Sequence, residues 1–181
     1  FEITYYGLKA PSNEPLIVTN EDVVARYRAY IEVADHHQYA MLASRRIAAL
    51  RLNEQEAAWT GDSFTSDEEE AVDPEVLAAS IRDFESLLAD HPDNASNDEI
   101  LYQLAKAYNI AAEPEETARV LEQLVERYPD SLYYLDAEFR LGELRYAMSD
   151  YVAAEQSFQR LVKHGRIGNK YYSNAGYMLG W

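Results

Sequence analysis

The stretch that decides the fold runs from residue 141 to residue 162 and reads LGELRYAMSDYVAAEQSFQRLV. It opens with Leu141-Gly142, passes through a polar turn at Ser149-Asp150-Tyr151, and continues into an apolar stripe formed by Ala154, Phe158, Leu161 and Val162. Residues three and four apart share one face of a helix, so the stripe predicts a helix with one buried side. The sequence therefore predicts two helices joined by a short turn, with Gly142 allowing the second helix to pack closely on the first.

The same pattern recurs along the chain with a spacing of 37 residues. This shift moves Phe84 onto Leu121 and Leu121 onto Phe158. It also moves the Tyr102-x-Leu104-Ala105 motif onto Phe139-x-Leu141-Gly142, and a shift of 38 carries Leu141-Gly142 onto Leu179-Gly180. Self-similarity at such a period is the signature of a repeat protein. We therefore expect stacked copies of a two-helix unit.

Prolines and capping residues set the expected helix bounds. Pro74 and Pro114 suit a first helical turn, whereas Pro92 and Pro129 suit a position just past a helix end. Ser96 through Glu99 has the form of a capping box. Helices are predicted over residues 21–34, 38–54, 74–90, 97–111, 114–128, 132–148, 150–164 and 170–181, and the fold class is all-α. No pair of strands with clear turn chemistry is expected.

Composition excludes several classes of protein. The chain has 181 residues, of which 48% are hydrophobic, so it can bury a core. It carries 32 acidic and 16 basic residues, a formal net charge of −16, which disfavours nucleic acid and anionic membrane surfaces as partners. It contains no cysteine, which excludes disulfides, thiolate catalysis and cysteine-bound metals. No apolar run is long enough to span a bilayer, so no direct membrane insertion is expected of this chain. Its start, without an initiator Met or a signal peptide, suggests a processed or excised piece.

A few short motifs have the form of chemical sites, but each lacks a required part. Gly61-Asp62-Ser63 lacks the preceding strand and the downstream Asp-x-x-His motif that an esterase nucleophile of this kind needs. The adjacent His36-His37 point in different directions on a helix. The acidic run Asp67 to Glu70 lacks the glycine turn and alternating ligands of a calcium loop. The basic segment 164–170 is interpreted as a turn between repeats. We expect no catalytic residue, no metal site and no cofactor.

These residues resemble the tetratricopeptide repeat (TPR). The resemblance rests on Leu141-Gly142, the Ser149-Asp150-Tyr151 turn, and the pair Ala154 and Phe158. The preceding repeat matches with Leu104-Ala105, Tyr108, Leu121 and Pro129, although Thr117 replaces the usual alanine. The period of 37, the Arg166 at the place of the closing proline, and an insertion over about 54–73 depart from the family pattern. The segments 124–131 and 136–142 resemble TPR proteins of the Gram-negative cell envelope, including those associated with TolA and with outer-membrane assembly. The segment 171–181 resembles large periplasmic TPR proteins of TonB-type systems.

The resemblance implies a right-handed α-solenoid of stacked antiparallel helix pairs. We expect an extended segment over 1–19, a first, divergent TPR-like pair over 20–58, an acidic loop over 59–73, and TPR repeats over 74–181, the last of them incomplete. In this family the first helix of each pair lines a concave groove. The residues at groove positions are Tyr102, Gln103, Lys106, Asn109, Ile110, Phe139, Arg140, Glu143, Tyr146, Tyr177 and Met178, with Arg45 and Arg46 on the early helix.

The expected function is that of a non-enzymatic scaffold, a module of a bacterial periplasmic protein that binds a protein or peptide partner in this groove. The net charge favours a basic or neutral partner. Two readings stay open beside it: a self-assembling structural element, and a ligand-binding or enzymatic domain on a solenoid frame. A cytoplasmic location is the alternative to the periplasm. Half-buried helix packing is the alternative for the groove residues, and for the tyrosine pairs 133–134 and 171–172 packing at repeat junctions is favoured.

Overall fold

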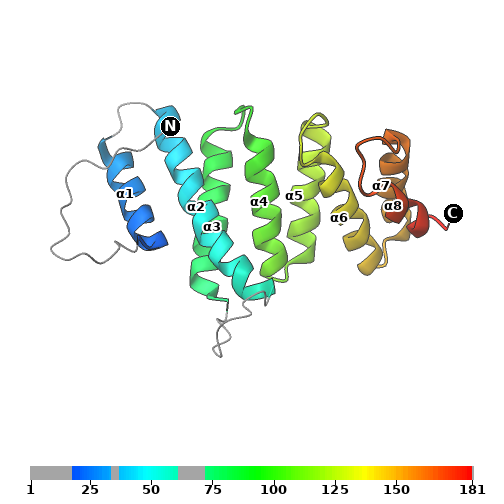
Figure 1. Cartoon of the computed structure of the whole chain (residues 1–181), viewed down its shortest axis with the longest axis horizontal. Coiled ribbons are helices and arrows are strands. Elements are labelled where there is room, and N and C mark those ends of the chain that lie inside the picture. The colour runs from blue at the N-terminus through cyan, green and yellow to red at the C-terminus, as the bar shows by residue number, and fades with distance from the viewer. Residues whose placement is uncertain (1–17, 34–36, 61–71, 181) are drawn as a thin grey trace.

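The computed structural model describes residues 18–33, 37–60 and 72–180, and these residues form helices and turns without a strand. The helices are α1 (Asn20–Val33), α2 (His37–Thr60), α3 (Pro74–Asp90), α4 (Asn97–Ile110), α5 (Pro114–Arg127), α6 (Tyr134–Ala147), α7 (Tyr151–His164) and α8 (Tyr172–Met178). Each helix packs against the next in the chain, and α2 also contacts α4. Figure 1 shows the resulting row of helices, from α1 in blue to α8 in red. The all-α, TPR-like helical solenoid is thus confirmed.

Most predicted helix bounds agree with the structure within two residues, and two do not. Helix α2 continues to Thr60 rather than ending at residue 54, so Trp59 and Thr60 belong to a helix and not to the expected acidic loop. The physical reason is that residues 54–58 are good helix formers and no glycine or proline interrupts them before Gly61. Helix α8 ends at Met178 rather than at 181. The predictions for residues 1–17 and 61–71 lie outside the described residues.

At the helix starts, one side chain forms a cap and one predicted cap is absent. Asp73 caps α3, because its carboxylate accepts hydrogen bonds from the backbone N–H groups of Glu75 and Val76 at 2.9 and 3.4 Å. The capping box predicted at Ser96 is absent: the Ser96 side chain makes no capping hydrogen bond. Its backbone (φ −99°, ψ 16°) lacks the extended conformation in which a serine hydroxyl reaches the N–H groups of the first turn.

A side-chain-to-backbone hydrogen bond, rather than a capping box, is found at each described junction between repeats. The side-chain oxygens of Asn94, Ser131 and Asn169 each accept a hydrogen bond from the backbone N–H two residues further on, at 2.8, 3.1 and 3.0 Å. This side-chain turn substitutes for a backbone turn and redirects the chain into the next helix. The three residues are spaced by 37 and 38 positions, so the device follows the period of the repeat.

The core follows the row of helices from α2 to α8 in two clusters. One cluster of buried side chains runs from α2 to α6 and includes Leu52, Phe84, Ile100, Leu121 and Leu141. A second, smaller cluster joins Ala154, Phe158 and Leu161 of α7 to Ala175 of α8, with Leu135 and Phe139 of α6 packed against it. Neighbouring repeats therefore bury each other's apolar faces, which is how a solenoid is stabilised.

Gly142, within the stretch 141–162, has the expected packing role. A Cβ atom at Gly142 would lie 2.7 Å from Cε1 and 2.8 Å from Cζ of the Phe158 ring. Both distances are below van der Waals contact, so the α6–α7 approach depends on the absence of a side chain at residue 142. One repeat earlier, Ala105 and Leu121 occupy the equivalent positions. Alanine is larger than Gly142, and leucine is smaller than Phe158, so the two differences compensate.

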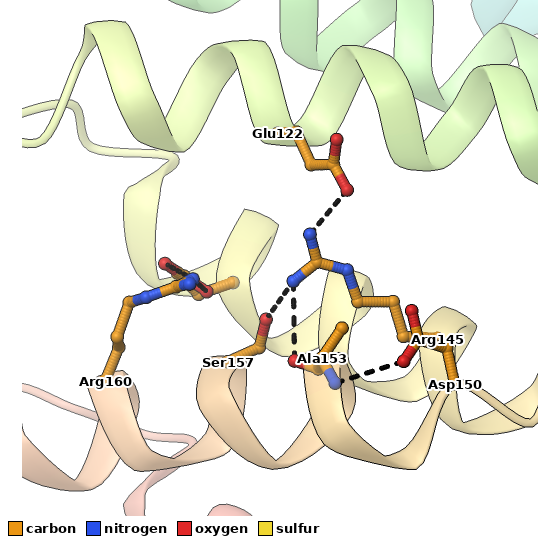
Figure 2. A network of polar contacts seen from close by, with 7 residues as sticks. Glu122, Arg145, Asp150, Ala153, Ser157 and Arg160 are labelled. Carbon is orange, nitrogen blue, oxygen red and sulfur yellow. Dashed lines mark hydrogen bonds and ion pairs between the residues drawn. The ribbon is translucent and has the colours of Figure 1, made fainter.

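A polar network connects three consecutive helices on the side of α5 and α7. The Arg145 guanidinium of α6 forms an ion pair with Glu122 of α5, donates a hydrogen bond to the Ser157 hydroxyl of α7 at 3.1 Å, and reaches the Ala153 carbonyl at 3.4 Å. Figure 2 shows this guanidinium between the two helices, with Asp150 capping α7 through the Ala153 N–H. Arg145 therefore fixes the position of α6 relative to its two neighbours.

Candidate protein-binding groove

A pocket of about 290 Å³ lies between α4 and α6. Its walls are Tyr102, Ala105, Lys106, Asn109 and Ile110 of α4 and Arg140, Glu143, Leu144 and Ala147 of α6, and Thr117 and Leu121 of α5 complete the lining. Within each wall the residues are spaced by three or four positions, which places them on one helix face. The apolar part of the lining can take a hydrocarbon side chain, and the charged part can orient its polar end. We call this pocket the groove.

The structure brings six of the predicted groove residues together. Tyr102, Lys106, Asn109 and Ile110 of α4 face Arg140 and Glu143 of α6 across the pocket. They meet because α4 and α6 are equivalent helices of successive repeats, separated by α5 in the chain. Their involvement in binding stays a prediction.

The remaining predicted residues lie elsewhere. Phe139 is half-buried at the α6–α8 junction, where its ring stacks on Tyr171 with centroids 4.7 Å apart and meets the edge of Phe158. Arg45 forms an ion pair with Glu99 at 2.9 Å, and Arg46 is exposed. Gln103 is half-buried, and within the described residues its buried Oε1 has no hydrogen-bond partner.

Three more predicted residues lie beyond the lining of the groove. Tyr146 is at the end of α6 next to Ala147 and packs edge-on against Tyr151. Tyr177 is exposed on α8, and Met178 packs against the second core cluster.

Asp136 is the polar centre of the α4–α6 wall. Its Oδ2 accepts a hydrogen bond from the Tyr102 hydroxyl at 2.6 Å and forms an ion pair with Arg140 Nε at 2.5 Å. Its Oδ1 accepts a hydrogen bond from the Tyr171 hydroxyl. One carboxylate thus connects α4, α6 and the segment that leads into α8. Three successive first helices are held in register on the groove side.

These contacts change the protonation of the groups involved. Burial opposes ionisation of Asp136, but the hydrogen bonds from Tyr102, Tyr171 and Arg140 outweigh it and lower the pKa of this carboxyl. Burial, followed by the hydrogen bond to Asp136, raises the pKa of Tyr102 to about 12. Burial also opposes the charged form of Arg140, yet its contacts with Asp136 and Tyr102 raise the pKa of the guanidinium. Near neutral pH this set is therefore an ionised carboxylate, a guanidinium and a neutral phenol.

Glu143 differs from Asp136 because burial dominates its protonation. Desolvation raises the pKa of its carboxyl; Arg140 opposes this shift and Asp136 adds to it. A carboxylate that has lost part of its hydration gains more from an incoming cation than a fully solvated one does. Glu143 is thus a candidate acceptor for a basic group in the groove.

Aromatic stacking recurs at the junctions with the period of the repeat. Tyr102 stacks on Tyr133 with ring centroids 4.6 Å apart and an interplanar angle of 18°. Phe139 stacks on Tyr171 at 4.7 Å and the same angle. Packing at repeat junctions is therefore confirmed for the first tyrosine of each of the two pairs.

Sequence reasoning missed Asp136 and Tyr171, whose contacts hold the helices beside the groove. The i,i+4 spacing of Asp136 and Arg140 was a usable signal for the ion pair on α6. No local signal indicates that two tyrosines, 34 residues before and 35 residues after Asp136, donate to the same carboxylate. That contact depends on how the repeats stack.

Two other kinds of site are absent from the residues that the structure describes. Among them, His, Asp and Glu nowhere gather in a group of three or more that could hold a metal ion. No helix within 18–33, 37–60 and 72–180 has both the length and the apolar character needed to cross a membrane.

Comparison with known proteins finds a family match for two segments of the chain. Residues 99–131 and 136–164 match the family model of the tetratricopeptide repeat. No curated protein matches the chain. A solved structure described as "MamA RS-1 ArsTM double mutant" is 18% identical, covers 80% of this chain and 74% of its own, and superposes with a TM-score of 0.44. The two matched segments cover most of α4 and α6 and all of α5 and α7, and the groove is lined by α4, α5 and α6. Tetratricopeptide repeats are in general protein–protein interaction scaffolds, and the fold supports binding of a protein partner.

Proposed function

We propose that this chain is a non-enzymatic scaffold that binds an extended segment of a partner protein in the groove between α4 and α6. The observation that carries the proposal is the groove itself, in which an apolar lining from three helices is combined with Lys106, Arg140 and Glu143. Such a combination of a hydrophobic surface with a few placed polar groups is typical of binding sites.

The proposal extends to the setting of the protein. We place it in the bacterial cell envelope, in the periplasm, on the basis of the envelope-type segments 124–131 and 136–142. The segment 171–181 favours a role beside a TonB-type system at the outer membrane. The lack of cysteine is compatible with an oxidising compartment. Fractionation of the native cells tests this part: recovery with cytosolic markers would refute the location without touching the groove.

Site-specific photo-crosslinking of the full-length protein in its native cells tests the groove. A photoreactive residue replaces Asn109, which lines the pocket, and in a control protein it replaces Gln159, an exposed residue of α7 that lies outside the groove. Mass spectrometry identifies the crosslinked chains. We expect a partner protein of the envelope to crosslink at residue 109 and not at residue 159.

Two other outcomes would overturn the proposal. Equal yields of the same partner at both positions would show that the groove has no special role. Crosslinks at residue 109 only to further copies of this chain would favour the self-assembling structural element instead.

A further inference from the structure

Four large apolar side chains lie exposed at the turn between α6 and α7. Tyr146 is 52% exposed, Met148 41%, Tyr151 59% and Val152 70%. The rings of Tyr146 and Tyr151 contact each other edge-to-face with centroids 5.3 Å apart, so the two residues form one surface across the turn. We call these four residues the turn patch. Clustered exposed apolar groups of this kind mark interaction sites, whereas scattered ones need no explanation.

The fold itself does not require apolar residues at these positions. The equivalent turn of the preceding repeat has the same backbone hydrogen bonds. In the α6–α7 turn the N–H groups of Met148 and Asp150 donate to the carbonyls of Leu144 and Arg145. In the α4–α5 turn those of Ala111 and Glu113 donate to the carbonyls of Ala107 and Tyr108. In that turn the positions of the patch are occupied by Asn109, Ala111, Pro114 and Glu115. One repeat thus makes the turn with small or polar residues, and the other exposes two tyrosines, a methionine and a valine. Tyr151 belongs to the turn of the repeat pattern, whereas the apolar side chains of Tyr146, Met148 and Val152 have no counterpart in that pattern.

The turn patch continues the groove. Glu143 and Ala147 line the groove on α6, Tyr146 lies one helical turn after Glu143, and Met148 is the C-cap of the same helix. A segment that fills the groove and follows α6 toward its C-terminus therefore passes onto the patch. Groove and patch together form a longer surface than the groove alone.

Acidic side chains border the turn patch, while the groove also carries Lys106 and Arg140, the latter in an ion pair with Asp136. Glu143 lies one turn of α6 before Tyr146, Asp150 precedes Tyr151, and Glu155 lies one turn of α7 after Tyr151 and Val152. The nearby cation Arg145 is engaged by Glu122 and Ser157 on the other side of α6. The whole chain has a net charge of −16, which disfavours a second copy as the occupant and favours a cationic one.

We propose that the turn patch and the groove form one continuous docking surface for an extended segment of another protein. This segment places a large apolar side chain against Tyr146 and Tyr151. Lys or Arg side chains that flank the apolar residue lie against Glu143, Asp150 and Glu155. This inference rests on the proposed function, since the groove must bind a segment before the patch can extend it. It adds the chemical class of that segment and the place of its apolar anchor.

Selection from a library of random twelve-residue peptides displayed on phage tests the inference. The full chain is the target, and the selected peptides are resynthesised for affinity measurement by fluorescence anisotropy. The patch variant combines Tyr146→Asn, Met148→Ala and Tyr151→Pro, which copies the preceding repeat and leaves the net charge unchanged. The proline suits the turn, because the ψ of Asp150 (71°) is close to that of Glu113 (78°), which precedes Pro114. The groove variant is Lys106→Ala with Asn109→Ala. Circular dichroism checks that both variants keep their helix content.

We expect the selected peptides to share an apolar residue flanked by Lys or Arg. The patch variant should weaken their binding about tenfold or more, the loss typical of buried aromatic anchors. A different result would overturn the inference and leave the proposed function standing: the selected peptides bind the unchanged protein and the patch variant equally well, and bind the groove variant more weakly. Selected peptides without basic residues would overturn the assigned class. Failure to select any peptide would count against both proposals.

Discussion

At the scale of single residues, two non-glycine residues hold a conformation that favours glycine. Ala112 and Ser149 have φ values of 57° and 66°, and they occupy equivalent places in the α4–α5 and α6–α7 turns. The left-handed region costs an L-residue roughly 1–2 kcal/mol relative to its usual conformations. Each turn tolerates this strain because the flanking helices are fixed by their packing.

Substitution of these residues by glycine should stabilise the protein. We expect Ala112→Gly and Ser149→Gly each to raise the free energy of unfolding by about 0.5–1 kcal/mol, since relief of strain outweighs the added freedom of the unfolded chain. Urea denaturation followed by circular dichroism measures the change. Gly165→Ala, at φ 96° with open space around its Cβ, is the opposite control and should destabilise. A loss of stability in both glycine variants would show that the turns are unstrained.

Asp136 gives the protein a predictable response to acid. Its pKa in the folded state is below its ordinary value of 3.8, because its hydrogen bonds outweigh the effect of burial. At a pH between the folded-state pKa and the unfolded-state pKa of this carboxyl, the unfolded chain binds more protons than the folded protein. The contribution of Asp136 to stability is therefore present above about pH 3.8 and disappears as the pH falls through the lowered folded-state pKa. Asp136→Asn should lower the free energy of unfolding at pH 7 by about 1–2 kcal/mol.

Urea denaturation of the natural protein and of Asp136→Asn, repeated at several values between about pH 2 and pH 7, tests this linkage. The difference in stability between the two proteins should stay constant down to about pH 4 and shrink below it, because the folded-state pKa lies below 3.8. A difference that stays constant over this range would show that the Asp136 charge does not contribute.

At the scale of helices, the approach of α6 to α7 depends on the pair Gly142 and Phe158. A methyl group at residue 142 would overlap the Phe158 ring, and overpacking of this kind costs about 1–3 kcal/mol. The preceding repeat shows how a larger first residue is accommodated, because Ala105 there accompanies Leu121. The two positions therefore have to be chosen together.

A double-mutant cycle measures this coupling. We expect Gly142→Ala to destabilise by about 1–3 kcal/mol and Phe158→Leu by on the order of 1 kcal/mol. The double variant should be more stable than the sum of the two losses allows, because leucine vacates the space that the new methyl group needs. Additive losses would mean that the structure relaxes in another way at this contact.

At the scale of the whole molecule, the excess of acidic residues acts over distance. With a net charge of −16, the chain should attract a basic segment through its long-range field as well as through contacts. We expect the affinity for the selected basic peptides to fall several-fold as the salt concentration rises from about 0.05 M to about 0.5 M, since the Debye length shrinks over this range. Anisotropy titrations at several salt concentrations provide the measurement, and an unchanged affinity would contradict electrostatic steering.

Much of this molecule can be predicted from its sequence. The 37-residue period, the prolines and the apolar stripes indicate the all-α fold and place most helix ends within two residues. These signals are local, because helix periodicity and proline geometry depend only on neighbouring residues. The predictions failed where local signals compete: the strong helix formers of residues 54–58 outweigh the acidic character that suggested a loop from residue 59.

The candidate site was only half predictable, for a physical reason. The repeat resemblance identifies which helix faces the groove, and six of the named residues do meet there. Packing between repeats decides the others, as it turns Phe139 into a stacking partner of Tyr171.

The repeat, the helical fold and the acidic charge follow from the amino-acid sequence, since they depend on composition and short-range spacing. The contacts that join Tyr102 and Tyr171 through Asp136, and the exposed surface formed by Tyr146 and Tyr151, instead depend on how the helices pack. The two phenols that meet at Asp136 are 69 residues apart in the chain, and only the stacking of the repeats brings them together.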